Sequence, residues 1–310
     1  EGTYIKIINP DGTVDYEGKE DNIRGRGNST WGYPKKPYAL KLDSKASILG
    51  MPKHKRWVLL ANWMDRTMLR NRVAFTIAEK TCLAWTPRGE FVEVILNGKH
   101  VGNYYLCEQI KVDENRVNIN ELEDTDTEGD AITGGYLMEL DTYYDEVNKF
   151  KSSIMELPYM FKEPDEDVLN KQQFAYMQNY VNRLEEVLYD DTYFAIREYA
   201  KYIDIDTYID WWLVHEITFN GEPNHPKSSY MHKDKGGELK AGPVWDFDWG
   251  TFVPTTTTLR LSKALYYERL LSDPVFVARL KERWAELKPK FEEIPAFIEG
   301  EKVRLSKSAD

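Results

Sequence analysis

The chain has 310 residues, of which 42% are hydrophobic and 13% aromatic, so it can bury a large core as one large domain or two small ones. Its 52 acidic residues outnumber its 41 basic ones, and the net charge of -11 argues against general nucleic-acid binding, which needs a basic surface. No apolar run has transmembrane length, and the start at Glu1 shows no signal-like segment from which a localisation could be read.

The first half of the chain is predicted to consist mainly of strands. Apolar and polar side chains alternate along residues 38–43, with Tyr38, Leu40 and Leu42 on one face. Asn97-Gly98 predicts a hairpin with a type I′ turn. The candidate strands are residues 3–9, 38–43, 56–61, 134–141 and the two arms of a hairpin over 91–110.

Helices are predicted from apolar spacing and become dominant in the second half. Asp65 is expected to cap a helix that carries Leu69, Val73 and Ile77 on one face. A second cap is expected at Asp206. The remaining predicted elements are helices over 165–189, 206–219 and most of the last 40 residues, strands over 228–233 and 239–245, and a solvated acidic loop over 121–130. This order favours an α+β fold.

The two cysteines, Cys82 and Cys107, lie far apart and lack the spacing of metal ligands. Sequence alone does not decide whether they form a disulfide, because that depends on the distance between them in space. We expect two buried free thiols.

The helix over 206–219 ends in a cluster of polar residues. Glu216 shares a face with Ile209 and Leu213, and Asn220 and Glu222 follow the helix end, where they could project into a cleft. The alternative is that Asn220-Gly221 only caps the helix, with Glu216 at the edge of the core, and this segment alone favours the alternative.

Two aspartates, Asp246 and Asp248, lie in the aromatic stretch GPVWDFDWGTF over 242–252. Burial of a charge costs several kcal/mol unless the charge is paired or binds a metal, and a second like charge adds to that cost. A hairpin that turns at Gly236-Gly237 would return both aspartates to the level of Glu222 and Asn224. On an extended chain their side chains would point to the same side.

An all-oxygen site of this kind favours Mg²⁺ or Mn²⁺ over zinc. Magnesium takes one or two carboxylates together with substrate phosphates, so a nucleotide is a natural companion. In the alternative interpretation Asp246 caps a turn, Asp248 pairs with an arginine, and the tryptophans belong to the core.

A basic, glycine-containing segment covers residues 22–43. Glycines let the backbone approach a ligand closely, and arginine and lysine bind phosphate oxygens, although the segment has no P-loop pattern. A solvated turn before an edge strand is an equally good interpretation. Lys41 is a specific candidate, because it lies on the face of its strand opposite the apolar residues. The other cations of the segment are Arg24, Arg26, Lys35 and Lys36.

Together these segments resemble the spore-coat-protein-H (CotH) kinase family of atypical protein kinases. The matching stretches, from about residue 20 to 250, are RGRGNSTWGYPKKPYALKLD, LLANWMDRTMLRN, FVEVILNGKHVGNYYLCEQIKVDENRVNI, GGYLMELD, KEPDEDVL, YIDIDTYIDWWLVHEI and GPVWDFDWG. The resemblance implies one domain over 1–310 with an atypical kinase-like fold. Its β-rich lobe would cover about 1–160 and its helix-rich lobe about 161–310.

The resemblance also implies transfer of the ATP γ-phosphoryl group to Ser or Thr of a protein, with Mg²⁺ or Mn²⁺, and an extracellular, cell-envelope or spore-coat-like location. Asp246 would hold the metal, assisted by Asp248 or Asn220. The phosphates would meet Lys41 or Lys36, with Arg24 and Arg26. Glu108 could orient a lysine, as the paired glutamate of ordinary kinases does, or could be an exposed hairpin residue.

The chain departs from the family at one important position. Family members carry Asn-x-Asp after the helix, whereas this chain has Asn220-Gly221-Glu222. Glu222 could still accept a hydroxyl proton, but a misplacement of about 1 Å can cost ~100-fold in rate. A slow kinase, a rearranged kinase and a nucleotide-binding pseudokinase therefore all stay open. His225 and Lys227 could compensate or only decorate the turn.

Two other functions compete with the kinase interpretation. The first is a non-catalytic surface or assembly scaffold that uses exposed aromatic residues. The second is a carbohydrate-active enzyme, because Asp246 and Asp248 on one face could meet the ~5–5.5 Å carboxyl separation of a retaining pair. A carbohydrate-active enzyme would leave the basic segment over 22–43 unexplained.

Overall fold

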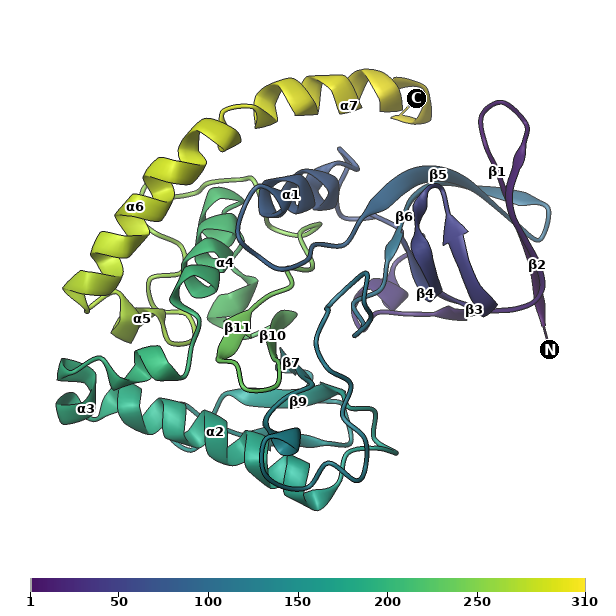
Figure 1. The fold of residues 1–310 in the computed structure, drawn as a ribbon. Coiled ribbons are helices and arrows are strands. Elements are labelled where there is room, and N and C mark those ends of the chain that lie inside the picture. The colour runs from purple at the N-terminus through teal and green to yellow at the C-terminus, as the bar shows by residue number, and fades with distance from the viewer. Residues whose placement is uncertain (1, 310) are drawn as a thin grey trace. The chain divides into compact units, whose positions relative to one another are not determined.

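The computed structural model describes residues 2–309, which divide into two compact units (Figure 1). The first unit comprises Glu1–Arg72, Pro87–Ile110 and Ala296–Asp310, and the second comprises Val73–Thr86 and Lys111–Pro295. Residues 1 and 310 lie outside the described part. Each unit contains one sheet.

The first unit is built on a six-stranded antiparallel sheet in the order β1-β2-β3-β4-β6-β5. The β5–β6 turn has positive φ at Asn97 (51°) and Gly98 (77°), which confirms the type I′ hairpin. The strands are β1 (Thr3–Ile8), β2 (Val14–Gly25), β3 (Tyr38–Ile48), β4 (Met51–Leu60), β5 (Gly89–Leu96) and β6 (Lys99–Glu108).

One face of this sheet carries a hydrophobic core. Leu40 and Leu42 are buried on β3, while Lys41 and Asp43 between and after them are exposed, as the alternation predicts. The core cluster also contains Trp57 and Leu59 of β4 and Tyr104 and Leu106 of β6.

The second unit contains a five-stranded antiparallel sheet in the order β11-β10-β7-β9-β8. The predicted strand over 239–245 is too long, because pairing ends at Ala241. Gly242 has a φ of 102°, and Pro243 has no N–H to donate to a neighbouring strand. The strands are β7 (Tyr136–Leu140), β8 (Lys149–Lys151), β9 (Pro158–Glu163), β10 (Ser229–Lys233) and β11 (Leu239–Ala241).

Most helices follow residue 170, so antiparallel sheets with helices toward the C-terminus confirm the α+β class. The helices are α1 (Arg70–Glu79), α2 (Lys171–Tyr189), α3 (Asp191–Ala195), α4 (Ile205–Ile217), α5 (Tyr267–Leu270), α6 (Pro274–Phe291) and α7 (Ile294–Ala309). Short 3₁₀ turns cover Thr30–Gly32, Ala131–Thr133, Glu198–Lys201 and Glu222–Asn224. Among residues 2–309, none of the helices is both long and apolar enough to cross a membrane.

Both predicted helix caps need correction. The side chain of Asp65 accepts from the backbone N–H of Arg70 at 2.8 Å, but the helix begins only at Arg70. Helix α4 is capped by Asp204, which accepts from the N–H of Thr207 at 3.0 Å. The predicted cap, Asp206, lies inside the helix because its carboxylate binds Arg279 of α6.

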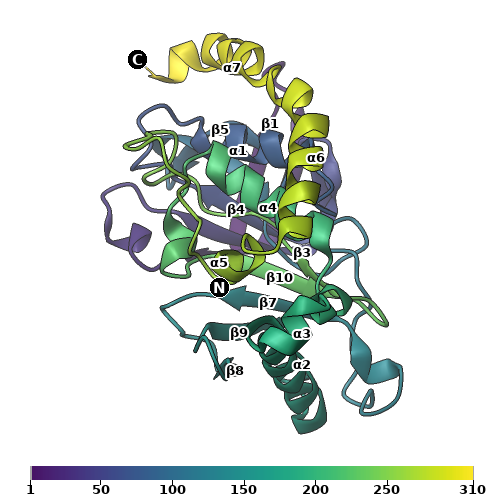
Figure 2. The same ribbon diagram turned by 90° about the vertical axis from the view of Figure 1, so that its left-hand side faces the viewer.

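Helix α2 packs against the sheet of the second unit, and both views show it alongside β9 (Figures 1 and 2). Phe174 of α2 lies with its ring centroid 5.2 Å from that of Phe161 on β9 and 5.9 Å from that of Phe150 on β8. The acidic segment 121–130 is a loop, as predicted, and its carbonyl group at Glu123 accepts from the side chain of Gln173.

The cysteine prediction is right for one residue and wrong for the other. Neither cysteine forms a disulfide within the described residues, but Cys107 is buried whereas Cys82 is exposed. Cys82 follows the end of α1 in a turn, which keeps its side chain near the surface.

Candidate functional site

The site in the second unit starts at the C-terminal end of α4. Phe219 adopts a left-handed conformation (φ 54°), and the N–H of Asn220 donates to the carbonyl of His215 at 2.8 Å. This is a Schellman-type ending with Phe219, rather than Asn220-Gly221, in the left-handed position. The capping alternative is therefore wrong in its residues, and the side chain of Asn220 is left for another role.

Asn220 joins the two predicted halves of the site. Its buried side chain donates from Nδ2 to the backbone oxygen of Asp246 at 3.4 Å. Its Oδ1 accepts from the N–H of Glu222 at 3.0 Å, so the same amide also fixes the start of the 3₁₀ turn Glu222–Asn224. The hairpin thus returns Asp246 to Asn220 and to the neighbourhood of the predicted Glu222, whereas the side chain of the other predicted neighbour, Asn224, donates to the carbonyl of Arg260.

Glu222 is half-buried, and this burial raises the pKa of its carboxyl group above the ordinary value. The negative charges of Asp246 and Asp141 raise that pKa further, whereas Lys227 and His225 lower it. Glu222 therefore lies within electrostatic reach of Asp246, and its proton affinity is higher than that of an exposed glutamate.

Asp246 does not continue a strand. Its φ of 68° places it in the left-handed region, so the prediction that Asp246 and Asp248 project from one side of an extended chain is wrong. The carboxylate of Asp246 accepts from the hydroxyl group of Ser228 at 3.3 Å. Asp248, which is also half-buried, follows two residues later.

The aromatic wall around these aspartates is only partly closed. Trp245 is buried and stacks on Phe75 with ring centroids 5.8 Å apart, and Phe247 is buried against His215 at 5.1 Å. Trp249, in contrast, is 55% exposed. Along the chain, Asp246 and Asp248 thus alternate with buried aromatic residues at the edge of the core. Both aspartates are partly exposed to solvent.

A family model described as CotH kinase protein matches residues 23–295. The chain belongs to the CotH kinase family. No curated protein matches the chain. The match includes all the predicted site residues of the second unit and all the predicted phosphate-binding residues of the first.

The CotH domain of this chain also contains site residues that the sequence analysis did not select. Asp141 follows β7 directly, and its carboxylate accepts from the N–H groups of Ser228 at 3.1 Å and Tyr143 at 2.8 Å. Burial raises its pKa. The register of β10 with β7 pairs Ser229 with Leu140, which brings Ser228 beside Asp141. The signal in the sequence was an aspartate that ends the strand GGYLMELD.

The side chains of this site carry oxygen atoms, the ligand type of hard divalent cations. Asp246, Asp248 and the amide of Asn220 offer carboxylate and carbonyl oxygens, the ligands that Mg²⁺ and Mn²⁺ prefer. Within residues 2–309, no group of three His, Cys, Asp or Glu side chains is arranged to hold a metal ion.

The predicted phosphate-binding residues belong to the first unit. Arg24 of β2 pairs with Ala39, and Lys41 of β3 pairs with Asn22, so Arg24 and Lys41 lie exposed on one face of the sheet. Nζ of Lys36 donates to the carbonyl of Trp31 at 2.5 Å and lies 5.3 Å from the centre of its ring.

Two further predicted residues of this unit have defined surroundings. The N–H of Arg26 donates to the carbonyl of Pro37 at 3.2 Å. Glu108 is fully buried and receives two hydrogen bonds from the guanidinium group of Arg88, at 2.9 and 2.8 Å, so it is not the exposed hairpin residue of the alternative interpretation.

The strand register also separates Glu108 from Lys41. Glu108 pairs with Trp57, and Trp57 pairs with Leu40, so these three side chains share the core face. Lys41 lies on the opposite face.

Proposed function

We propose that this CotH family member is an atypical kinase that transfers the γ-phosphoryl group of ATP to Ser or Thr hydroxyl groups of a protein substrate. The observation that carries the proposal is the junction in the second unit, where one amide, Asn220, bonds both Asp246 and Glu222. A raised pKa at Glu222 beside an aspartate is typical of acid–base sites.

Glu222 would accept the proton of the attacking hydroxyl group. A general base works best when its pKa approaches the working pH, and burial, the largest cause, shifts the pKa of Glu222 in that direction. The bond from Asn220 fixes the backbone of Glu222. This reduces the misplacement that the extra methylene relative to aspartate could cause.

Asp246 and Asp248, with Asn220, would hold Mg²⁺ or Mn²⁺, which when bound neutralises phosphate charge. Ser228 orients the carboxylate of Asp246 by donating to Oδ2 at 3.3 Å. Asp141 in turn holds the backbone N–H of Ser228 at 3.1 Å. Asp141, at the end of β7, therefore helps to position Asp246 through Ser228.

The first unit, taken by itself, carries candidate phosphate-binding residues. Arg24 and Lys41 are exposed on one face of its sheet, where a phosphate could approach them. Arg26 and Lys36 lie on the adjoining glycine-containing segment. Glu108 would act through a neighbouring cation in the same unit, since its carboxylate binds Arg88.

Calorimetric titration of ATP, with and without Mg²⁺ or Mn²⁺, tests the proposal. We expect metal-dependent binding to the wild type, loss of binding in Asp246→Ala, and unchanged binding in the control Asp167→Ala, which removes an exposed charge. Absence of binding to the folded wild type with every metal would overturn the proposal and favour a non-catalytic scaffold.

A further inference from the structure

One cation of the second unit lies directly against the Asn220–Glu222 turn. A Cβ atom added to Gly221 would meet Nη2 of Arg260 at 2.5 Å and Nε at 2.6 Å, so the guanidinium group packs on the backbone of Gly221. The same group lies 5.1 Å from the ring centre of Phe219. Arg260 therefore borders the residue that separates Asn220 from Glu222.

The backbone of Arg260 is fixed from the same segment. Its N–H donates to the carboxylate of Glu216 at 2.9 Å, and the N–H of Leu261 donates to the other carboxylate oxygen. Its carbonyl accepts from the side chain of Asn224 at 3.1 Å. The loop that carries Arg260 is thus anchored to the end of α4 and to the 3₁₀ turn, which limits the positions available to the guanidinium group.

The charge of Arg260 is not used in an ion pair. Other arginines of the second unit bind carboxylates: among them, Arg269 binds Asp191, Arg279 binds Asp206 and Arg283 binds Asp210. For Arg260, no carboxylate within residues 2–309 lies within ion-pair distance of the guanidinium group, which is exposed. A cation that is free of ion pairs and carried by an anchored backbone beside an acidic site is available to an anionic ligand.

Gly221 makes this approach possible. Its φ of -99° is open to any residue, so the backbone conformation does not require glycine. The space that a Cβ atom would occupy is filled by Arg260. A Cβ atom at position 221 would therefore displace the guanidinium group, which belongs to an exposed, flexible side chain, without straining the backbone.

We propose that Arg260 contacts the phosphoryl group during its transfer. The inference rests on the proposed function and adds a phosphate-binding cation within the second unit itself. In the reaction, the acceptor oxygen forms a bond to the γ-phosphorus, the bond from that phosphorus to the bridging oxygen of ADP breaks, and the hydroxyl proton passes to Glu222. Arg260 makes no covalent bond and stabilises the charge on the transferring oxygens.

The first test compares Arg260→Ala with Lys263→Ala, a matched loss of a surface cation whose nearest carboxylate, in Glu268, lies 3.8 Å away. With a Ser/Thr peptide and Mg²⁺-ATP, we expect kcat of Arg260→Ala to fall by about 10³-fold, as for arginines that contact a transferring phosphoryl group, while KM for ATP changes little. Arg260→Lys should recover part of kcat, because lysine restores the charge without the planar group. Lys263→Ala should behave as wild type.

Gly221→Ala is a sharper variant, because it displaces the guanidinium group and keeps its charge. We expect it to lower kcat in the wild type and to add little in an Arg260→Ala background, since the two changes remove the same contact. Melting temperatures of all variants, measured in parallel, separate this effect from unfolding.

A second readout does not depend on turnover. Binding of Mg²⁺-ADP with aluminium fluoride, which imitates a transferring phosphoryl group, should weaken at least about 10-fold in Arg260→Ala, whereas binding of Mg²⁺-ADP alone should not change. Equal kcat or equal fluoride-complex affinity in Arg260→Ala and Lys263→Ala would overturn the inference and leave the proposed function standing. A wild type with neither turnover nor binding would overturn the proposed function and the inference with it.

Discussion

At the scale of single residues, the raised pKa of Glu222 favours a role in catalysis and lowers the stability of the folded protein. Burial and the charges of Asp246 and Asp141 raise its pKa in the folded protein. A carboxyl group with a raised pKa contributes most to stability when protonated, below its unfolded pKa, and that contribution is lost as the pH rises through the folded pKa. At neutral pH the carboxyl group of Glu222 therefore lowers the free energy of unfolding.

Glu222→Gln should separate these effects. We expect a decrease in kcat of about 10²–10⁴-fold, because the proton acceptor is lost, together with a melting temperature at pH 7 above that of the wild type. The two melting temperatures should converge at pH 4. Glu222→Asp, which restores the residue of the family pattern, should retain transfer. A Gln variant with wild-type kcat would exclude Glu222 as the base.

His215 predicts a second effect of a single residue. It is fully buried between Trp211 and Phe247, and neither ring nitrogen has a hydrogen-bond partner within residues 2–309. Burial lowers its pKa from 6.5 to about 3. Below pH 6.5 the unfolded chain therefore takes up a proton that the folded chain does not, and the free energy of unfolding falls as the pH decreases.

His215→Leu should remove this penalty. Leaving a buried polar group without a partner costs about 1–3 kcal/mol, so we expect the variant to gain stability of that order at pH 7 and more at pH 5. Urea unfolding at both pH values measures the difference. A variant that is less stable than the wild type at pH 5 would show that the ring has a structural partner.

The residue scale also shows what a sequence can and cannot predict about a site. Asn220, Glu222 and Asp246 were selected from the sequence because carboxylates beside aromatic residues are unusual and a hairpin joins the two segments. Asp141 and Arg260 were not. The position of Asp141 beside Ser228 depends on the register of β10 with β7, and the position of Arg260 depends on the path of the loop that Glu216 anchors. No local sequence pattern predicts that register or that path.

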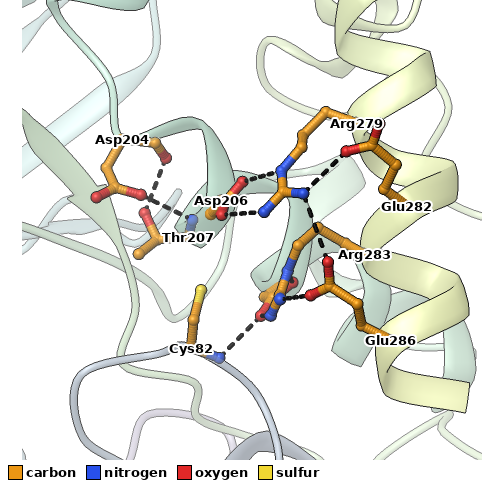
Figure 3. Close-up of polar contacts among 9 residues, drawn as sticks. Cys82, Asp204, Asp206, Thr207, Arg279, Glu282, Arg283 and Glu286 are labelled. Atoms are coloured by element: carbon orange, nitrogen blue, oxygen red, sulfur yellow. Dashed lines mark hydrogen bonds and ion pairs between the residues drawn. The ribbon is translucent and has the colours of Figure 1, made fainter.

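At the scale of elements, two ion pairs join α4 to α6 (Figure 3), and their carboxylates differ in burial. Arg283 binds Asp210 through two hydrogen bonds, at 3.0 and 2.6 Å, and the side chain of Asp210 is fully buried. Asp210 also accepts from the N–H of Cys82 at 2.8 Å. Arg279 binds Asp206 in the same way, but Asp206 is 38% exposed.

Arg283→Ala and Arg279→Ala should therefore differ in cost. Loss of Arg283 leaves a buried charge without its cation, and we expect a decrease of about 3–5 kcal/mol in the free energy of unfolding. Loss of Arg279 should cost ~1 kcal/mol or less, because water can solvate Asp206. Urea unfolding measures the loss in the free energy of unfolding for each variant. Equal losses would contradict the role assigned to burial of the carboxylate.

The start of α2 offers another element-scale prediction. Asn170 caps the helix through Oδ1, which accepts from the N–H of Gln173 at 2.9 Å, and its Nδ2 donates to the carbonyl of Asp124 at 2.8 Å. Asn170→Ala should cost about 1 kcal/mol. Asn170→Asp keeps the cap and loses only the bond to the acidic loop, so its melting temperature should lie closer to that of the wild type. Equal losses in both variants would assign the stability to the loop contact.

Elements were easier to predict than their ends. Alternation along β3 and the Asn97-Gly98 turn are local signals, and the structure confirms both. The cap of α4 was misplaced by two residues, because Asp204 and Asp206 are equally good caps in isolation and only the position of Arg279 distinguishes them.

At the scale of the whole molecule, each unit has its own antiparallel sheet, and the second unit contains most of the helices. The sequence predicted the α+β class because strand and helix periodicities occupy different parts of the chain. It did not predict the strand order of either sheet, which depends on long-range pairing such as that of β10 with β7. The kinase-like fold and the boundaries of its lobes stay predictions.

The most direct test is transfer of labelled γ-phosphate from ATP to a Ser/Thr protein substrate, measured with the wild type and with Asp246→Asn. Equal melting temperatures of the two proteins show that both are folded. The account predicts Mg²⁺- or Mn²⁺-dependent transfer by the wild type and none by Asp246→Asn, because the amide removes the charge beside Asn220 and Glu222 and leaves the fold intact. Full transfer by Asp246→Asn would contradict the assignment of the site.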